Sequence, residues 1–153
     1  MSGLIFSVLL ETAALTSLVK LLRDKFNFRE VADGRGWHGY VERGGRMVEV
    51  FVKLEEGRAQ FILPDASIPR EVCKEVVKHI ASRIYVEAYG RNLSPSDVVI
   101  VVPSQSFCHY CLKPVRELLF KCKRCGGFYC SRHRLPETHN CPGIETLRTA
   151  VST

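Results

Sequence analysis

The stretch Cys122–Cys141, CKRCGGFYCSRHRLPETHNC, holds four of the seven cysteines of this chain and two of its five histidines. Extended back to Cys108, the pattern reads C-x2-C, ten residues, C-x2-C, four residues, C-x2-H, five residues, H-x-C. Four close pairs of thiolate and imidazole ligands match the needs of two tetrahedral zinc ions. We therefore predict two zinc ions, bound by Cys108, Cys111, Cys122, Cys125, Cys130, His133, His139 and Cys141.

This segment is too short to fold on hydrophobic burial alone. A module of about 35 residues lies below the roughly 40 residues at which a chain usually buries enough core unaided. Structural zinc contributes on the order of 10–16 kcal/mol per site. The metal is therefore expected to replace a core in a segment whose apolar supply is Tyr110, Leu112, Leu118, Leu119, Phe120, Phe128 and Tyr129.

The spacing leaves open which ligand pairs share an ion. In a consecutive arrangement, the first two pairs bind one ion and the last two pairs bind the other. In an interleaved arrangement, the first and third pairs share one ion, and the second and fourth share the other. Gly126-Gly127 suits a tight turn that would place the second and third pairs side by side, but both arrangements bind two ions.

The run from Cys108 resembles the AN1-type zinc finger in the type and spacing of all eight ligands. Phe120 lies two places before the third cysteine, Tyr129 precedes the fifth, and the ending HR-x-PE-x-H-x-C at His133–Cys141 also matches. The resemblance covers about residues 108–143. It implies an interleaved cross-brace in which His109 is not a ligand, with the sets Cys108/Cys111/Cys130/His133 and Cys122/Cys125/His139/Cys141.

The residues before the finger predict an α+β fold, with an antiparallel sheet and two main helices. Apolar residues recur at helical spacing from Ala13 to about Phe26. A second helix is expected after Ser67, with Pro69 in its first turn and an end near Tyr89. Leu4–Leu10 could be a strand or the start of a helix. The predicted strands are Trp37–Glu42, Arg46–Leu54, Ala59–Leu63 and a buried strand at Val98–Val102.

We divide the chain into an α+β domain of unknown function at 1–103, a finger at 104–143 and a tail at 144–153, with Ser104–Ser106 as the junction. The first domain shows no catalytic constellation and no phosphate-binding loop. His38 and His79 have no partner at a defined spacing, so we interpret them as satisfied or surface side chains. Cys73 borders the apolar stripe of the second helix and is interpreted as a small buried side chain.

The charge of +6 is uneven, because residues 1–103 hold 14 Lys/Arg against 13 Asp/Glu while residues 104–153 hold 8 against 3. The net charge of residues 104–153 is therefore +5, and six thiolates with two Zn²⁺ ions lower it to about +3. No Lys or Arg occurs in the first six residues and Glu11 interrupts the apolar start, which disfavours a signal peptide or membrane span. We expect a soluble cytoplasmic protein.

The pattern predicts a zinc-binding protein that is not an enzyme, whose finger is an interaction or adaptor module. The resemblance implies protein partners linked to ubiquitin-like proteins, the proteasome or AAA unfoldases. An acidic protein surface is the expected partner of Lys113, Arg116, Lys121, Lys123, Arg124, Arg132 and Arg134. Nucleic-acid binding is the alternative, and an active site within residues 1–103 is a third hypothesis.

Overall fold

The computed structural model describes residues 3–102, 106–116, 118–139 and 141. The predicted domain boundary at 103–104 and the tail 144–153 lie outside these residues. The helices and strands are β1 (Leu4–Leu9), α1 (Thr12–Asp24), β2 (Arg29–Val31), β3 (Gly36–Arg43), β4 (Arg46–Glu55), β5 (Arg58–Leu63), α2 (Arg70–Tyr89), β6 (Val98–Val101), β7 (Ser106–Phe107), β8 (Pro114–Val115), β9 (Phe120–Lys121) and β10 (Phe128–Tyr129). Short 3₁₀ turns occur at Ala32–Gly34, Pro95–Asp97 and Pro136–Thr138.

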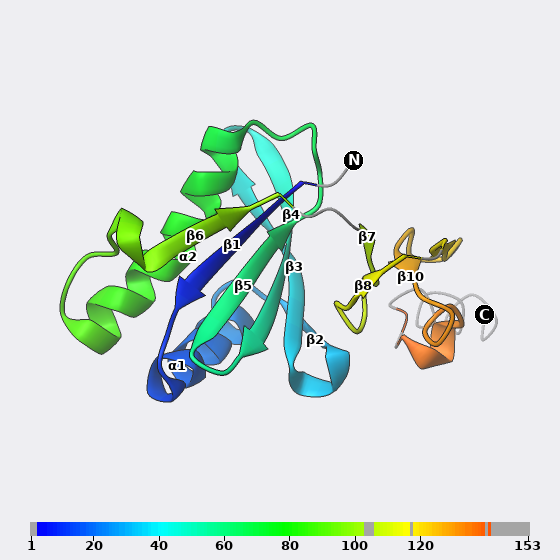
Figure 1. The fold of residues 1–153 in the computed structure, drawn as a ribbon, viewed down its shortest axis with the longest axis horizontal. Helices are drawn as coiled ribbons and strands as arrows, with labels where there is room; N and C mark the ends of the chain where they lie inside the picture. The colour runs from blue at the N-terminus through cyan, green and yellow to red at the C-terminus, as the bar shows by residue number, and fades with distance from the viewer. Residues whose placement is uncertain (1–2, 103–105, 117, 140, 142–153) are drawn as a thin grey trace, which may run out of the picture.

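Six of the strands form one antiparallel sheet in the order β2-β3-β4-β5-β1-β6. The hairpin between β3 and β4 turns at Gly44 and Gly45, whose φ angles of 59° and 76° suit a two-residue turn. Figure 1 shows α1 and α2 together at one side of this sheet and the C-terminal strands at the other. The predicted α+β architecture with two helices and an antiparallel sheet is confirmed.

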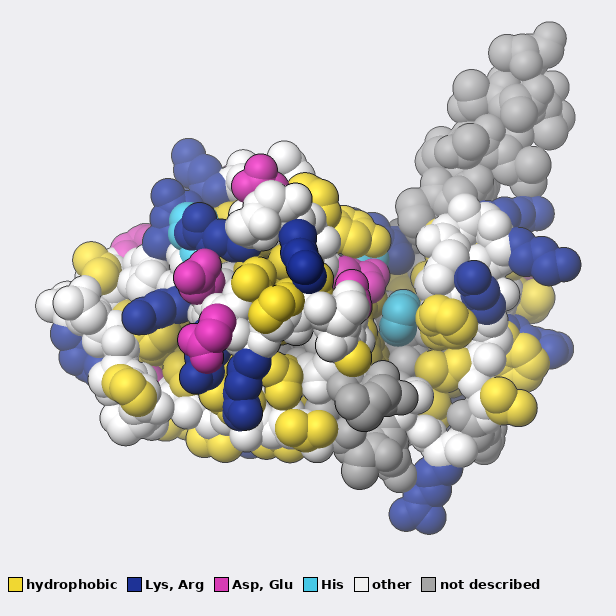
Figure 2. All heavy atoms as spheres, turned by 90° about the horizontal axis from the view of Figure 1, so that it is seen from above, with side chains coloured by type: hydrophobic (Ala, Val, Ile, Leu, Met, Phe, Trp, Pro, Cys, Tyr) yellow, Lys and Arg dark blue, Asp and Glu magenta, His cyan; other side chains and the backbone are white. Residues whose placement is uncertain are grey.

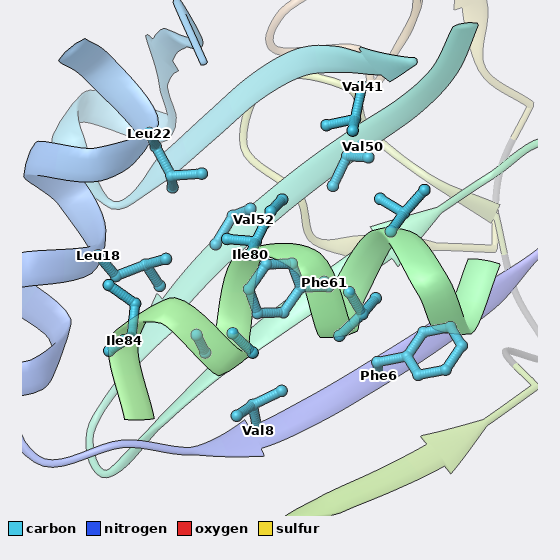
Figure 3. Packing of buried hydrophobic residues seen from close by; sticks show 14 of the residues in the cluster. Phe6, Val8, Leu18, Leu22, Val41, Val50, Val52, Phe61, Ile80 and Ile84 are labelled. Atoms are coloured by element: carbon cyan, nitrogen blue, oxygen red, sulfur yellow. The ribbon is translucent and has the colours of Figure 1, made fainter. Parts of the chain in front are cut away.

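The main hydrophobic core lies between the helices and one face of the sheet. Phe61, Val52 and Val8 alternate with outward residues along their strands and meet Ile80 and Ile84 of α2 (Figure 3). Leu18 and Leu22 of α1 close the same core. α2 begins after Pro69 and ends at Gly90, which takes the left-handed conformation (φ 64°) that favours glycine.

At the edges of the sheet, the structure corrects one expectation and adds one strand that was not predicted. Val98–Val102 was predicted to be buried, but β6 is an edge strand in which Val99 is 58% and Val101 45% exposed. An apolar run of this length does not reveal whether a second neighbouring strand exists. The opposite edge, β2, is a three-residue strand that lacks a readable alternation and escaped the sequence analysis.

Candidate metal centre

The first ligand group lies where two short turns meet. Cys108 follows β7 directly, and its knuckle is closed by the Leu112 N–H, which donates to the Cys108 carbonyl at 2.9 Å. Cys130 follows β10, and the His133 N–H donates to the Cys130 carbonyl at 3.0 Å. These turns bring together the side chains of Cys108, Cys111, Cys130 and His133.

The second group forms at the other end of the β9–β10 hairpin. Its first knuckle is held by backbone hydrogen bonds from Cys122 N to Gly127 O and from Gly126 N to Cys122 O, both 2.8 Å long. Gly126 takes a positive φ of 76°, as the tight turn requires. The last ligand, Cys141, donates its N–H to the carbonyl of Pro136 at 2.9 Å. The members are Cys122, Cys125, His139 and Cys141.

The separations inside both groups fit tetrahedral zinc. The Sγ atoms of Cys111 and Cys130 are 4.0 Å apart and those of Cys122 and Cys141 are 3.7 Å apart. Zn–S bonds of about 2.3 Å place two thiolates of a tetrahedron about 3.8 Å apart. The same sulfur distances far exceed a disulfide bond of about 2.05 Å. Two separate groups, each with three thiolates and one imidazole, thus fit two zinc ions.

A hydrogen bond and an aromatic stack orient His139 within the second group. Its Nε2 lies 3.8 Å from the Cys125 Sγ, while its Nδ1 donates to the carbonyl of His133 at 2.6 Å. A metal-binding histidine is usually fixed in this way by a partner on its other nitrogen. The ring stacks on Tyr129 at 3.7 Å, and the Tyr129 hydroxyl lies 3.1 Å from the Cys125 sulfur. Since the accepting carbonyl belongs to a member of the first group, the two groups are mechanically linked.

The eight residues group as the resemblance implied. The first pair lies with the third and the second pair with the fourth, so the interleaved arrangement that spacing alone left open is the one present. Hydrogen bonding from Cys111 lowers the pKa of the Cys108 thiol. The same hydrogen bond raises the pKa of Cys111. Zinc binds cysteine as the thiolate, so binding of the ion releases the protons that remain on its ligands.

The finger is docked on the free face of the large sheet. Leu112 is 2% exposed and packs in one cluster with Val31, Phe51 and Ile62, at the face of the sheet that the helices do not cover. Figure 1 shows the β7–β8 hairpin lying against the strands of the sheet. Phe51 is fully buried there although no helix reaches it. This buried contact joins the two parts of the chain.

Close fit and polar contacts support this docking. A Cβ built on Gly36 would lie 2.6 Å from the Cδ1 of Leu112, so glycine makes room for the leucine. The Tyr110 hydroxyl donates to the Asp33 carboxylate at 3.1 Å. The ligand pattern and the strand patterns did not predict this interface. The available signal was Phe51 on the outward face of its strand, because a large aromatic residue there needs a cover.

The remaining histidines have structural partners. The ring of His109 belongs to neither ligand group and packs 4.8 Å from Phe51. His38 stacks on Phe51 with the ring centroids 4.2 Å apart, and its Nε2 lies 2.9 Å from the Glu49 carboxylate. Burial is the largest single effect on Glu49 and opposes its ionisation, but the hydrogen bond and charge interaction with His38, together with His109 and Tyr40, outweigh it and lower the pKa of Glu49.

Two further sequence interpretations agree with the positions found. His79 packs edge-on against Phe26 at 5.8 Å. Cys73 is buried with 2% exposure, and this burial raises the pKa of its thiol.

A cavity of about 610 Å³ lies between the sheet and the finger, with His38, Tyr40 and Glu49 on one wall and Phe128 on the other.

Charged side chains surround the two ligand groups. All seven Lys and Arg residues between Lys113 and Arg134 are exposed. Glu137 is the single acidic residue among residues 106–116, 118–139 and 141. On the face shown in Figure 2, Lys and Arg side chains and apolar side chains cover the finger, whereas acidic side chains lie over the N-terminal part.

The comparisons with known proteins identify the C-terminal segment. Residues 107–146 match the family model of the AN1-like zinc finger, as the resemblance of the ligand pattern predicted. This match covers the finger and not the larger α+β part. No curated protein and no solved structure matches the chain. Within the part of the chain that the structure describes, no helix is both long and apolar enough to cross a membrane.

Proposed function

We propose that the protein is a non-enzymatic, zinc-stabilised adaptor whose finger binds an acidic surface of another protein. The observation that carries this proposal is a pair of ligand groups, each with four protein side chains, enclosed by exposed cations. A zinc ion with four protein ligands has no open position for water or substrate, so its role is structural.

The charge of the finger favours an acidic partner. In the described part of the finger, seven cations stand against Glu137, and two zinc centres with three thiolates each add −2, which leaves a net charge of +4. The rigid cross-brace holds these cations at fixed positions, which favours a specific partner over diffuse attraction. The resemblance makes ubiquitin-like proteins, proteasome subunits and AAA unfoldases the first candidates.

The same proposal places the protein in the cytoplasm. Thiols stay reduced there and are free to bind zinc. An extracellular setting would instead favour disulfides between cysteines that lie this close together.

The experiment compares two charge reversals in affinity capture followed by direct binding to the captured protein. Arg124→Glu/Arg132→Glu changes the finger, whereas Lys20→Glu/Lys78→Glu makes the same change in net charge on exposed positions of the helices. The proposal expects the first variant to lose the partner and the second to keep it. Equal loss in both variants, or in neither, would contradict it.

Nucleic acid is the second candidate, favoured by the same exposed cations. Phosphate contacts release counterions, so binding to duplex DNA would weaken with salt at a slope of about 0.9 per contact. Gel-shift titration of the zinc-loaded chain at two salt concentrations separates the candidates. A shift that disappears with salt supports nucleic acid, and the absence of a shift at low salt removes it.

A further inference from the structure

The β9–β10 hairpin of the finger has two faces with different surroundings. Tyr129 lies opposite Phe120, and Phe128 lies opposite Lys121. Opposed side chains in an antiparallel pair share a face, and neighbours along a strand point to opposite faces. Phe120 and Phe128 therefore lie on opposite sides of the hairpin, although their exposed fractions, 42% and 41%, are nearly equal.

The face with Phe128 looks toward the N-terminal part. Phe128 lines the cavity shared with His38 and Glu49, and its N–H donates to the ring of His109 at 3.3 Å. The sheet and this face of the hairpin thus form two walls of one cavity. The side chain of Phe120, on the other face, is next to Tyr129, which is held by its stack on His139. Phe120 therefore stands on a rigid support.

The surroundings of Phe120 combine apolar area with positive charge. The guanidinium of Arg134 lies over the Phe120 ring at 5.3 Å. Leu118, which is 88% exposed, lies two residues before Phe120, and Leu135, which is 49% exposed, follows Arg134 directly. We call Leu118, Phe120, Arg134 and Leu135 the Phe120 surface. An aromatic ring and an arginine on a rigid frame are the residue types that contribute most binding energy at protein interfaces.

Resting on the proposed function, we infer that the Phe120 surface is the binding site of the finger and takes a peptide segment with a large apolar side chain flanked by Asp or Glu. The apolar residue of the partner would cover Phe120 and the leucines. Its carboxylates would pair with Arg134, to which a planar guanidinium can offer two parallel hydrogen bonds. The excess of cations in the finger selects an acidic segment over a neutral or basic one.

The test uses a random peptide library displayed against the full, zinc-loaded chain. We expect the enriched peptides to carry an aromatic residue or leucine flanked by acidic residues. A synthetic enriched peptide is then titrated against variants whose zinc content is first shown to equal that of the wild type. Phe120→Ser and Arg134→Gln should each weaken its binding by about tenfold or more.

Phe128→Ser is the matched control, since it removes an equally exposed ring from the other face. It should change the affinity by less than about twofold. If Phe128→Ser weakens binding as much as Phe120→Ser, the site is the cavity beside the sheet, and the inference fails while the proposed function stands. Enrichment of no peptide would overturn the inference alone, whereas enrichment of neutral or basic peptides would overturn both.

Discussion

The N-terminal part and the finger reach the same end, a fixed arrangement of strands, by different means. The core of the N-terminal part consists of aliphatic and aromatic side chains from both helices and the sheet. The buried cluster of the finger contains Cys108, Cys122, Cys141 and Tyr129. Three of these four are predicted zinc ligands. Burial of apolar surface therefore stabilises one part, and metal coordination is expected to stabilise the other.

The contact between the two parts is stabilised by burial of apolar surface. Leu112 is in the zinc knuckle, yet it packs against Val31, Phe51 and Ile62 of the sheet. The finger thus contributes an apolar side chain to a second core, and the sheet provides a surface that the finger lacks on its own. The comparison predicts that damage to the metal sites and damage to the main core have separable effects.

The largest effect is expected from removing one zinc ligand. Cys130→Ser should abolish the first zinc site, which represents on the order of 10 kcal/mol, while the main core stays intact. Native mass spectrometry should find fewer zinc ions per chain. Cys73→Ser is the control, because Cys73 is the one cysteine outside the ligand groups and should leave the zinc content unchanged. A Cys130→Ser chain that still carries two ions would contradict the assignment.

A large cavity in the main core should have the opposite effect, namely a less stable N-terminal part with an unchanged zinc content. Phe61 is fully buried between the sheet and the helices. Phe61→Ala should lower the free energy of unfolding of the N-terminal part by about 3–5 kcal/mol, as measured by urea titration of the secondary structure. The zinc content should not change. Loss of zinc in this variant would show that the two parts do not have separate sources of stability.

Removing the docking contact between the finger and the sheet is expected to lower stability less and to change how the two parts tumble in solution. Leu112→Ala should remove about 2–5 kcal/mol of packing, after which the two parts tumble separately. Relaxation of the backbone ¹⁵N nuclei should then give each part its own correlation time. Leu135→Ala, a change at a half-exposed leucine of the finger, serves as the control. If the two parts of the Leu112→Ala variant still tumbled with one correlation time, other contacts would hold the finger on the sheet, which would contradict the central role of Leu112.

The smallest effect concerns the turn before β6. Hydrogen bonds from Arg91, and then from Ser94, hold the pKa of Asp97 well below its usual range. Because the folded pKa is depressed, Asp97 stabilises the fold above its unfolded pKa of about 3.9, and this contribution is lost as the pH falls through that value toward the folded pKa. The difference in unfolding free energy between wild type and Asp97→Asn should therefore shrink on acidification. A difference that is independent of pH would contradict the ion pair.

Much of the fold could be read from local patterns. The period of α1, the boundaries of α2 at Pro69 and Gly90, and the Gly44-Gly45 hairpin depend on neighbouring residues, and these predictions agree with the structure. The exposed edge at β6 could not be read, because strand order depends on contacts distant in sequence.

The metal centre, too, could be predicted only in part from the sequence. Spacing predicted eight ligands in four pairs, but it could not choose which pairs meet, since that choice depends on how the hairpin folds back on the first knuckle. The resemblance supplied the interleaved pairing. The close contact between Leu112 and Gly36 could not be predicted, because the sequence around neither residue indicates that the two meet.

Amide hydrogen exchange of the full chain, with and without a strong chelator, tests most directly whether the metal is the core of the finger. We expect zinc removal to abolish protection in residues 106–116 and 118–139, while β1, β4, β5 and α2 remain protected. Protection that persists in the finger after zinc has been shown to be absent would contradict it.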